Sequence, residues 1–342
     1  MAKERLHYID IFKGICLILV VIHHAPLAYM GHFAQQGSVL WYINNFAIAF
    51  FMPAFFVATG YCTNFNQRFK VYLLKNIKTI MLPCYCLYYL NRYINNLNTW
   101  FFEDASWLTL SHWLAPGIRT FVEEGGFYWF LSALFIAKLL MYLLLNIKSK
   151  LYQTIGAVSF MLVGTYLYQY NILPNNFFYQ HAFILVSFMF FGRILKEHEM
   201  KINSIAKRIS VPFVLFVLFL PLIGIDIPTV TRTITVKLFT LPLFVVLSLG
   251  GSIIVWYLSR LISKSNWLEY IGKGSLVEYC FNYATLCFIA NIYKETLKMV
   301  EGDLFITDSM ACLIIASVTI MILPAFYWVL DHKYIKVIIG KF

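Results

Sequence analysis

An apolar stretch near the start of the chain, residues 9–29, contains four ionisable side chains. Asp10 and Lys13 lie at one end of it, and His23 and His24 lie at the other. Ionisable groups inside a membrane-spanning helix are energetically costly, so they usually face a cavity or a partner instead of lipid. Where they occur, they mark ligand sites or proton relays. This stretch is therefore the first candidate for a functional site.

The eleven-residue separation of Lys13 and His24 places both side chains on one face of a helix. At about 100° per residue it makes roughly three turns, with the two side chains about 16 Å apart along the axis. Asp10 precedes Lys13 by three residues, shares its face and can pair with it. In the alternative interpretation, Lys13 reaches the headgroups, His24 is a satisfied buried group and His23 faces elsewhere. The shared face favours a function.

The composition assigns this helix to a polytopic membrane protein. The chain is 61% hydrophobic and 13% charged, with a mean hydropathy of +0.72, which excludes a soluble globular protein. A bilayer requires about 20 apolar residues per helix. We therefore predict one all-α domain, residues 1–342, with about ten spans in a transmembrane bundle. The predicted spans are 9–30, 39–61, 72–94, 126–146, 151–170, 178–195, 210–226, 238–259, 275–292 and 308–330.

The basic residues orient this bundle. Nineteen Lys and Arg residues fall in the segments predicted to lie on the same side of the membrane as the N-terminus. Five fall in the segments predicted to lie on the opposite side. This bias predicts that both termini are cytoplasmic. It also accounts for the net charge of +11, so we expect no nucleic-acid partner. The seven cysteines lie in apolar segments without metal-ligand spacing, and we expect neither disulfides nor a metal site.

Other residues carry weaker signals. Pro53 in the second predicted span indicates a kink, which can line a site or serve packing alone. Arg68, Lys70, Lys75 and Lys78 form the densest cationic run on the predicted inner face. Membrane orientation explains some of these charges, and phosphate binding is the alternative.

The ninth predicted span contains Glu278 and Asn282 on one face. A buried glutamate requires a partner or a proton, and Lys13, Lys138, Arg92 or a histidine would serve. A structural ion pair and a catalytic role stay open. The outer loop around residues 95–125 is rich in tryptophan and carboxylates, which suit sugar recognition, but tryptophan is also expected at membrane interfaces.

Taken together, these segments resemble the acyltransferase family 3, bacterial membrane O-acyltransferases that modify surface polysaccharides. The resemblance covers nearly the whole chain. Its most specific part is the ten-residue gap between Lys13 and His24, similar to the family's basic-x10-His motif. Lysine stands here where arginine is common in the family, and Asn282 stands where many members have histidine. The other matching segments are Phe50–Tyr61, Pro83-x-Tyr85, Tyr128–Leu131, Phe191-Gly192 and Ile271–Leu276.

The resemblance implies a bacterial inner-membrane enzyme that transfers an acyl group from acetyl-CoA to a hydroxyl of an extracytoplasmic glycan or lipid-linked sugar. His24 would act as general base, or would carry the acyl group transiently; the first route needs one fewer intermediate. Asp10 would orient Lys13. The implied CoA phosphate ligands are Lys13, Arg68, Lys75 and Lys78, and the implied acceptor-side residues are Glu278, Asn282 and Trp129.

The competing hypothesis is a proton-coupled secondary transporter or glycan exporter. In it, Lys13, His24, Lys138 and Glu278 would form a proton relay. Such a transporter is expected to contain inverted repeats with broken helices in both halves, and the sequence shows no such repeat. A third hypothesis is an acyltransferase-like fold recruited to transport or modify an amino acid.

Overall fold

The computed structural model describes residues 6–34, 36–102, 128–299 and 307–342. These residues are almost entirely helical, and among them no strand forms beyond an isolated bridge between Val230 and Ile234. The predicted all-α class is therefore confirmed. The outer-loop residues from Glu103 to Glu124, considered above for sugar recognition, lie outside the described residues.

Each of the ten predicted spans overlaps one or more helices of the described residues. Five segments of the described chain are long and apolar enough to cross a membrane: α1, α2 with α3, α11, α12 and α14. The helices are α1 (His7–Met30), α2 (Val39–Ile48), α3 (Phe51–Cys62), α4 (Phe69–Asn76), α5 (Leu82–Phe102), α8 (Trp129–Leu145), α9 (Lys150–Gln169), α10 (Tyr179–Glu197), α11 (Glu199–Leu222), α12 (Leu241–Ile262), α13 (Asn266–Met299) and α14 (Asp308–Leu330), with short elements η1 (Ile77–Met81), η2 (Asn176–Phe178) and η3 (Lys336–Ile339).

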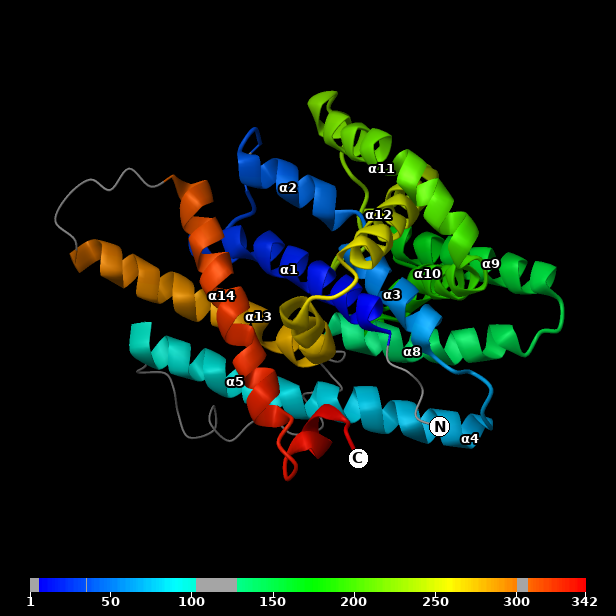
Figure 1. Cartoon of the computed structure of the whole chain (residues 1–342), viewed down its shortest axis with the longest axis horizontal. Helices are drawn as coiled ribbons and strands as arrows, with labels where there is room; N and C mark the ends of the chain where they lie inside the picture. Colours follow the sequence, from blue (N-terminus) through cyan, green and yellow to red (C-terminus); the bar gives the residue numbers. More distant parts are fainter. Residues whose placement is uncertain (1–5, 35, 103–127, 300–306) are drawn as a thin grey trace.

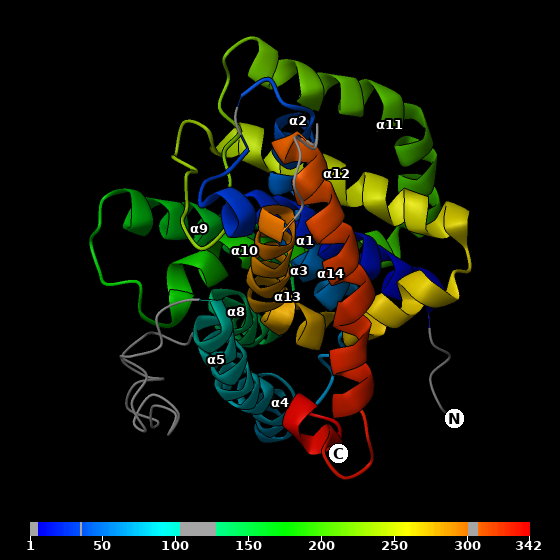
Figure 2. The same cartoon turned by 90° about the vertical axis from the view of Figure 1, so that its left-hand side faces the viewer.

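Helix α1 runs through the middle of the bundle (Figures 1 and 2). It packs against α2, α3, α12, α13 and α14, and its buried side chains include Phe12, Leu17 and Val20. Helix α11 lies at the edge of the bundle and exposes much of its apolar surface. The helix with the ionisable residues is thus the helix that the others enclose.

Glycines allow the helix backbones to touch. A Cβ on Gly272 of α13 would lie 1.8 Å from the Asp10 carbonyl oxygen, and one on Gly14 would lie 2.4 Å from that of Leu268. Small residues at such crossings are the usual means of close packing between helices in membranes, where no hydrophobic force drives association. Gly60 of α3 makes a similar contact with α10. These contacts set the register of α1 on α13.

The contacts between α1 and α13 also show that the two helices run parallel. Asp10 lies beside Gly272 at the start of both helices, and the Tyr29 and Tyr293 rings lie 5.8 Å apart toward their ends. A parallel pair agrees with the predicted first and ninth spans, which both run from the inner to the outer side.

The second predicted span is interrupted, as Pro53 indicated. Helix α2 ends at Ile48 and α3 begins at Phe51, so Pro53 lies in the first turn of a new helix. Proline is tolerated there because the first backbone N–H groups of a helix have no intrahelical acceptor. Because Pro53 has no N–H, the Ala49 carbonyl four residues before it receives no helical hydrogen bond, and the break lies at this carbonyl. Ser248 of α12 supports the break by donating a 2.7 Å hydrogen bond to the Ala49 carbonyl.

We expect Gly272→Ala to destabilise the protein by about 2 kcal/mol, because the added methyl group would force α1 and α13 apart. The measurement is the thermal unfolding midpoint of the purified protein in detergent. Gly156→Ala is the matched control, since its new methyl group would meet only the flexible end of Leu144. Equal midpoints for the two variants would contradict this account of the packing.

Candidate functional site

Asp10 and Lys13 form an ion pair near the start of α1. The Lys13 Nζ lies 2.8 Å from Asp10 Oδ1, as their three-residue spacing predicts. Asp10 is 4% exposed, and the Lys13 side chain is about a quarter exposed. An ammonium group has three donors, so Lys13 can hold Asp10 and still bind a further anion. The carboxylate thus fixes a cation at the start of α1.

His24 is fixed in one tautomer by its own helix. Its Nδ1 lies 2.8 Å from the Val20 carbonyl oxygen. A carbonyl only accepts hydrogen bonds, so Nδ1 carries the proton and Nε2 keeps a lone pair. Among the described residues, Nε2 has no hydrogen-bond partner, and the ring edge faces Tyr283 of α13 at 6.1 Å. The histidine is therefore arranged as a base or a nucleophile.

His23 is also part of this site, contrary to the interpretation in which it faces elsewhere. Its ring lies 5.1 Å from that of His24 and packs between Phe33 and Phe51. It is buried, and its Nδ1 has no hydrogen-bond partner in the described part of the chain. Sequence spacing alone did not show this, because Phe51 reaches the ring only through the break between α2 and α3.

The other predicted cations lie elsewhere on the predicted inner face. Arg68 precedes α4, Lys75 lies in the last turn of α4, and the Lys78 Nζ lies 5.1 Å from the Phe342 ring centre. Lys78 belongs to η1, a π-helical turn, and such turns are frequent at functional sites. No contact among the described residues joins these cations to Lys13. They form a separate group.

Arg68 lines a cavity of about 360 Å³ with Gln67, Tyr142 and Asn146. This cavity lies between the loop before α4 and the end of α8. Its lining combines a guanidinium group, three side-chain amides and two aromatic rings. These groups are suited to an anionic ligand that also carries a planar ring.

The three predicted acceptor-side residues do not converge. Glu278 Oε1 is buried beside Gly274, which also faces Tyr327 of α14. Asn282 donates to the Tyr279 carbonyl, and its Oδ1 is buried without a partner in the described ranges. Neither oxygen contacts the lysines, arginine or histidines proposed as partners for Glu278. That expected pairing is therefore wrong within the described residues.

Trp129, at the start of α8, packs against the buried His181 of α10 with ring centres 5.2 Å apart. His181 is fully buried. Trp129 therefore lies on the α10 side of the bundle, whereas Glu278 faces α14.

A polar network at the start of α1 was not predicted. The Tyr8 hydroxyl lies 2.6 Å from that of Tyr61 and donates to Glu199, which accepts a 2.9 Å hydrogen bond from Arg260. The Arg260 guanidinium also lies over the Tyr8 ring at 5.3 Å. The network joins α1, α3, α11 and α12. We did not predict this network, because the predicted span began at residue 210. Helix α11 instead begins at Glu199, whose carboxylate is part of the network.

The comparison with known families covers nearly the whole chain. A family model described as an acyltransferase domain matches residues 6–330, nearly the whole chain. No curated protein and no solved structure matches the chain. The matched range includes every predicted site residue.

A pH-dependent contribution to stability is expected from Glu269, which lies outside the predicted span 275–292. A 2.7 Å hydrogen bond from His7 holds the pKa of Glu269 below its usual value. A lowered pKa stabilises the fold above the unfolded value of about 4.3, and this contribution is lost as the pH falls through the folded pKa. Glu269→Gln should therefore lower the unfolding midpoint at pH 7, with a smaller difference near pH 3.5.

The control for this measurement is Asp226→Asn, which removes a carboxylate from an exposed loop residue. This variant should unfold like the wild type at both pH values. A Glu269→Gln deficit of the same size at both pH values would contradict an electrostatic role for this pair.

Proposed function

Because the chain belongs to the acyltransferase family 3, we propose that this membrane acyltransferase moves an acetyl group from cytoplasmic acetyl-CoA to a hydroxyl of an extracytoplasmic glycan. The single observation that carries the proposal is the arrangement on α1. The helix holds a cation in its first turns and, about 16 Å along the axis, a histidine with a free Nε2. The compartment that we propose is the bacterial inner membrane.

The donor would be held by its phosphates on the predicted cytoplasmic side. Lys13 retains donors beyond its pair with Asp10, and Arg68 lines a cavity beside Tyr142. We assign the CoA phosphates to Lys13, Arg68, Lys75 and Lys78, with the thioester arm directed along α1 toward His24.

The chemical step would use His24 as a general base. Its Nε2 removes the proton of the acceptor hydroxyl while that oxygen attacks the thioester carbonyl carbon. The carbon–sulfur bond then breaks, CoA leaves as a thiolate, and the imidazolium returns the proton to the sulfur. Attack by Nε2 itself, giving an acyl-histidine, would need one more intermediate.

The acceptor, a glycan or a lipid-linked sugar, would enter from the outer side. Glu278 and Asn282 stay proposed acceptor residues because each has a buried oxygen without a partner among the described residues. Such an oxygen is stabilised when a ligand hydroxyl donates to it. Trp129 would border the acceptor route from the side of α10.

We expect His24→Ala to lower acetyl transfer by about 10² to 10⁴-fold, the range typical for loss of a general base. The assay is turnover of acetyl-CoA by the purified protein in nanodiscs. His32→Ala is the matched control, because His32 is exposed just beyond the end of α1. Transfer at the wild-type rate by His24→Ala would contradict the assigned role.

A second variant tests donor binding. Lys13→Gln keeps a hydrogen-bond donor for the buried Asp10 and removes the positive charge, so the fold should persist while the Kd for acetyl-CoA rises about tenfold. Lys13→Arg keeps the charge and should bind acetyl-CoA nearly as the wild type does. A folded wild-type protein that binds no acetyl-CoA would overturn the acetyl-CoA proposal and favour transport.

A further inference from the structure

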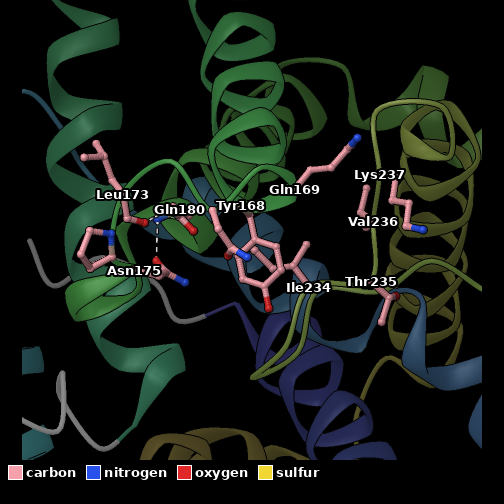
Figure 3. Close-up of a pocket in the computed structure, with 11 residues that line it drawn as sticks. Tyr168, Gln169, Leu173, Asn175, Gln180, Ile234, Thr235, Val236 and Lys237 are labelled. Carbon is pink, nitrogen blue, oxygen red and sulfur yellow. Dashed lines mark hydrogen bonds between the residues drawn. The ribbon is translucent and has the colours of Figure 1, made fainter.

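A polar cavity of about 780 Å³ lies between the turn that joins α9 to α10 and the loop that precedes α12 (Figure 3). Polar side chains supply seven of its eleven lining residues, and none of the eleven is a carboxylate. Those seven are Tyr168, Gln169, Asn171, Asn175, Gln180, Thr235 and Lys237. The volume lies in the range of ligand-binding pockets.

The cavity lies at the opposite end of α9 from the cavity of Arg68. The Arg68 cavity includes Asn146, which is close to the start of α9, and the polar cavity includes Gln169, the last residue of α9. Twenty helical residues span about 30 Å, the thickness of the hydrocarbon core of a bilayer. The charge distribution predicts that both loops of the polar cavity are extracytoplasmic. The position suits a ligand that arrives from outside.

His181 holds the two walls of this cavity together. Its Nδ1 lies 2.9 Å from the Asn175 amide nitrogen in one wall, and its Nε2 lies 3.2 Å from the Arg232 carbonyl oxygen in the loop of the other. The bond to a carbonyl requires a proton on Nε2, so Nδ1 accepts from Asn175. Because His181 is buried, neither bond competes with solvent. The cavity is preformed.

The side-chain amides in the walls are oriented by hydrogen bonds within the protein. Gln169 Oε1 accepts from the Leu238 backbone N–H at 2.9 Å, which leaves its amide nitrogen as a donor. Gln180 Nε2 donates to the Leu173 carbonyl at 2.9 Å, which leaves its Oε1 as an acceptor. Figure 3 shows the Gln180 side chain linked to the turn that bears Leu173 and Asn175. Fixed donors and acceptors reduce the entropy that a polar ligand loses on binding.

The chemistry of these walls points to a saccharide. Fixed amides match the alternating donors and acceptors of sugar hydroxyls, and the Tyr168 ring offers an apolar surface for a pyranose. Lys237 and the absence of carboxylates among the lining residues favour a neutral or negatively charged sugar over a cationic ligand. The Tyr168 ring contacts His181, which packs on Trp129, so the cavity adjoins the proposed acceptor route.

We propose that this cavity binds a saccharide segment of the acceptor outside the reacting hydroxyl. The assignment rests on the proposed transfer to a glycan. It adds the site at which an extended acceptor is held while its hydroxyl reaches His24.

The test is saccharide binding by the full chain in nanodiscs, measured on an array of bacterial mono- and oligosaccharides. The wild type should bind at least one sugar, and Tyr168→Ala should weaken that binding at least tenfold. Tyr170→Ala is the matched control, because Tyr170 is an exposed tyrosine two residues away that does not line the cavity. Acetyl-CoA affinity should be unchanged in both variants.

A second variant distinguishes a loss of sugar binding from a loss of the fold. Gln169→Glu keeps an oxygen for the Leu238 N–H and replaces the free amide donor with a carboxylate, so it should also weaken sugar binding at least tenfold while the unfolding midpoint is kept. Sugar binding unaffected by both changes, or no sugar bound by the wild type, would overturn the cavity assignment. Acetyl-CoA titration distinguishes the two proposals. If the wild type binds a sugar but no acetyl-CoA, only the proposed transfer reaction is overturned.

Discussion

The contact between the Asp10 carbonyl and the hydrogen of Gly272 sets the geometry of the site. With no side chain at Gly272, α13 lies directly against the turn of α1 that carries Asp10 and Lys13. Because the two helices run in parallel, this register also determines which residue of α13 faces His24, namely Tyr283. A shift of α1 by one turn would move the ion pair and the histidine together by about 5.4 Å. The close packing therefore positions both functional ends of α1 at once.

The chemistry follows from the separation of charge along one helix. At its start, a buried carboxylate holds an ammonium close to the predicted cytoplasmic side. Farther along, the neutral form of His24 keeps a lone pair on Nε2, because its one ring proton lies on Nδ1 and is donated to the Val20 carbonyl. A general base needs a lone pair, and an anionic ligand needs a cation to bind it. Helix α1 supplies the lone pair and the cation at different depths. A donor bound by phosphates at one end can thus present its acyl group at the other.

Local patterns in the sequence predicted much of this arrangement, and tertiary contacts decided the rest. The three-residue spacing gave the Asp10–Lys13 pair, and the eleven-residue spacing gave the shared face with His24, because a helix fixes both distances. The contacts of His23 were not predictable in this way. Pro53 indicated the break at Ala49, because it cannot donate to the Ala49 carbonyl, but the partner of that carbonyl, Ser248, comes from far along the chain. Similarly, no spacing rule brings Arg232 to His181.

The two cavities are also separated along the bundle, as the cation and the histidine are separated along α1. The Arg68 cavity and the polar cavity adjoin opposite ends of α9, and both are lined by side-chain amides, a tyrosine and a cation. The cation is a guanidinium group in the first cavity and an ammonium group in the second. Neither cavity includes His24. In the proposed reaction, a charged donor and a hydroxylated acceptor would not need to cross the bilayer, because only the small acyl group would pass between them. The position of α1 among five other helices would keep water away from the thioester during that transfer.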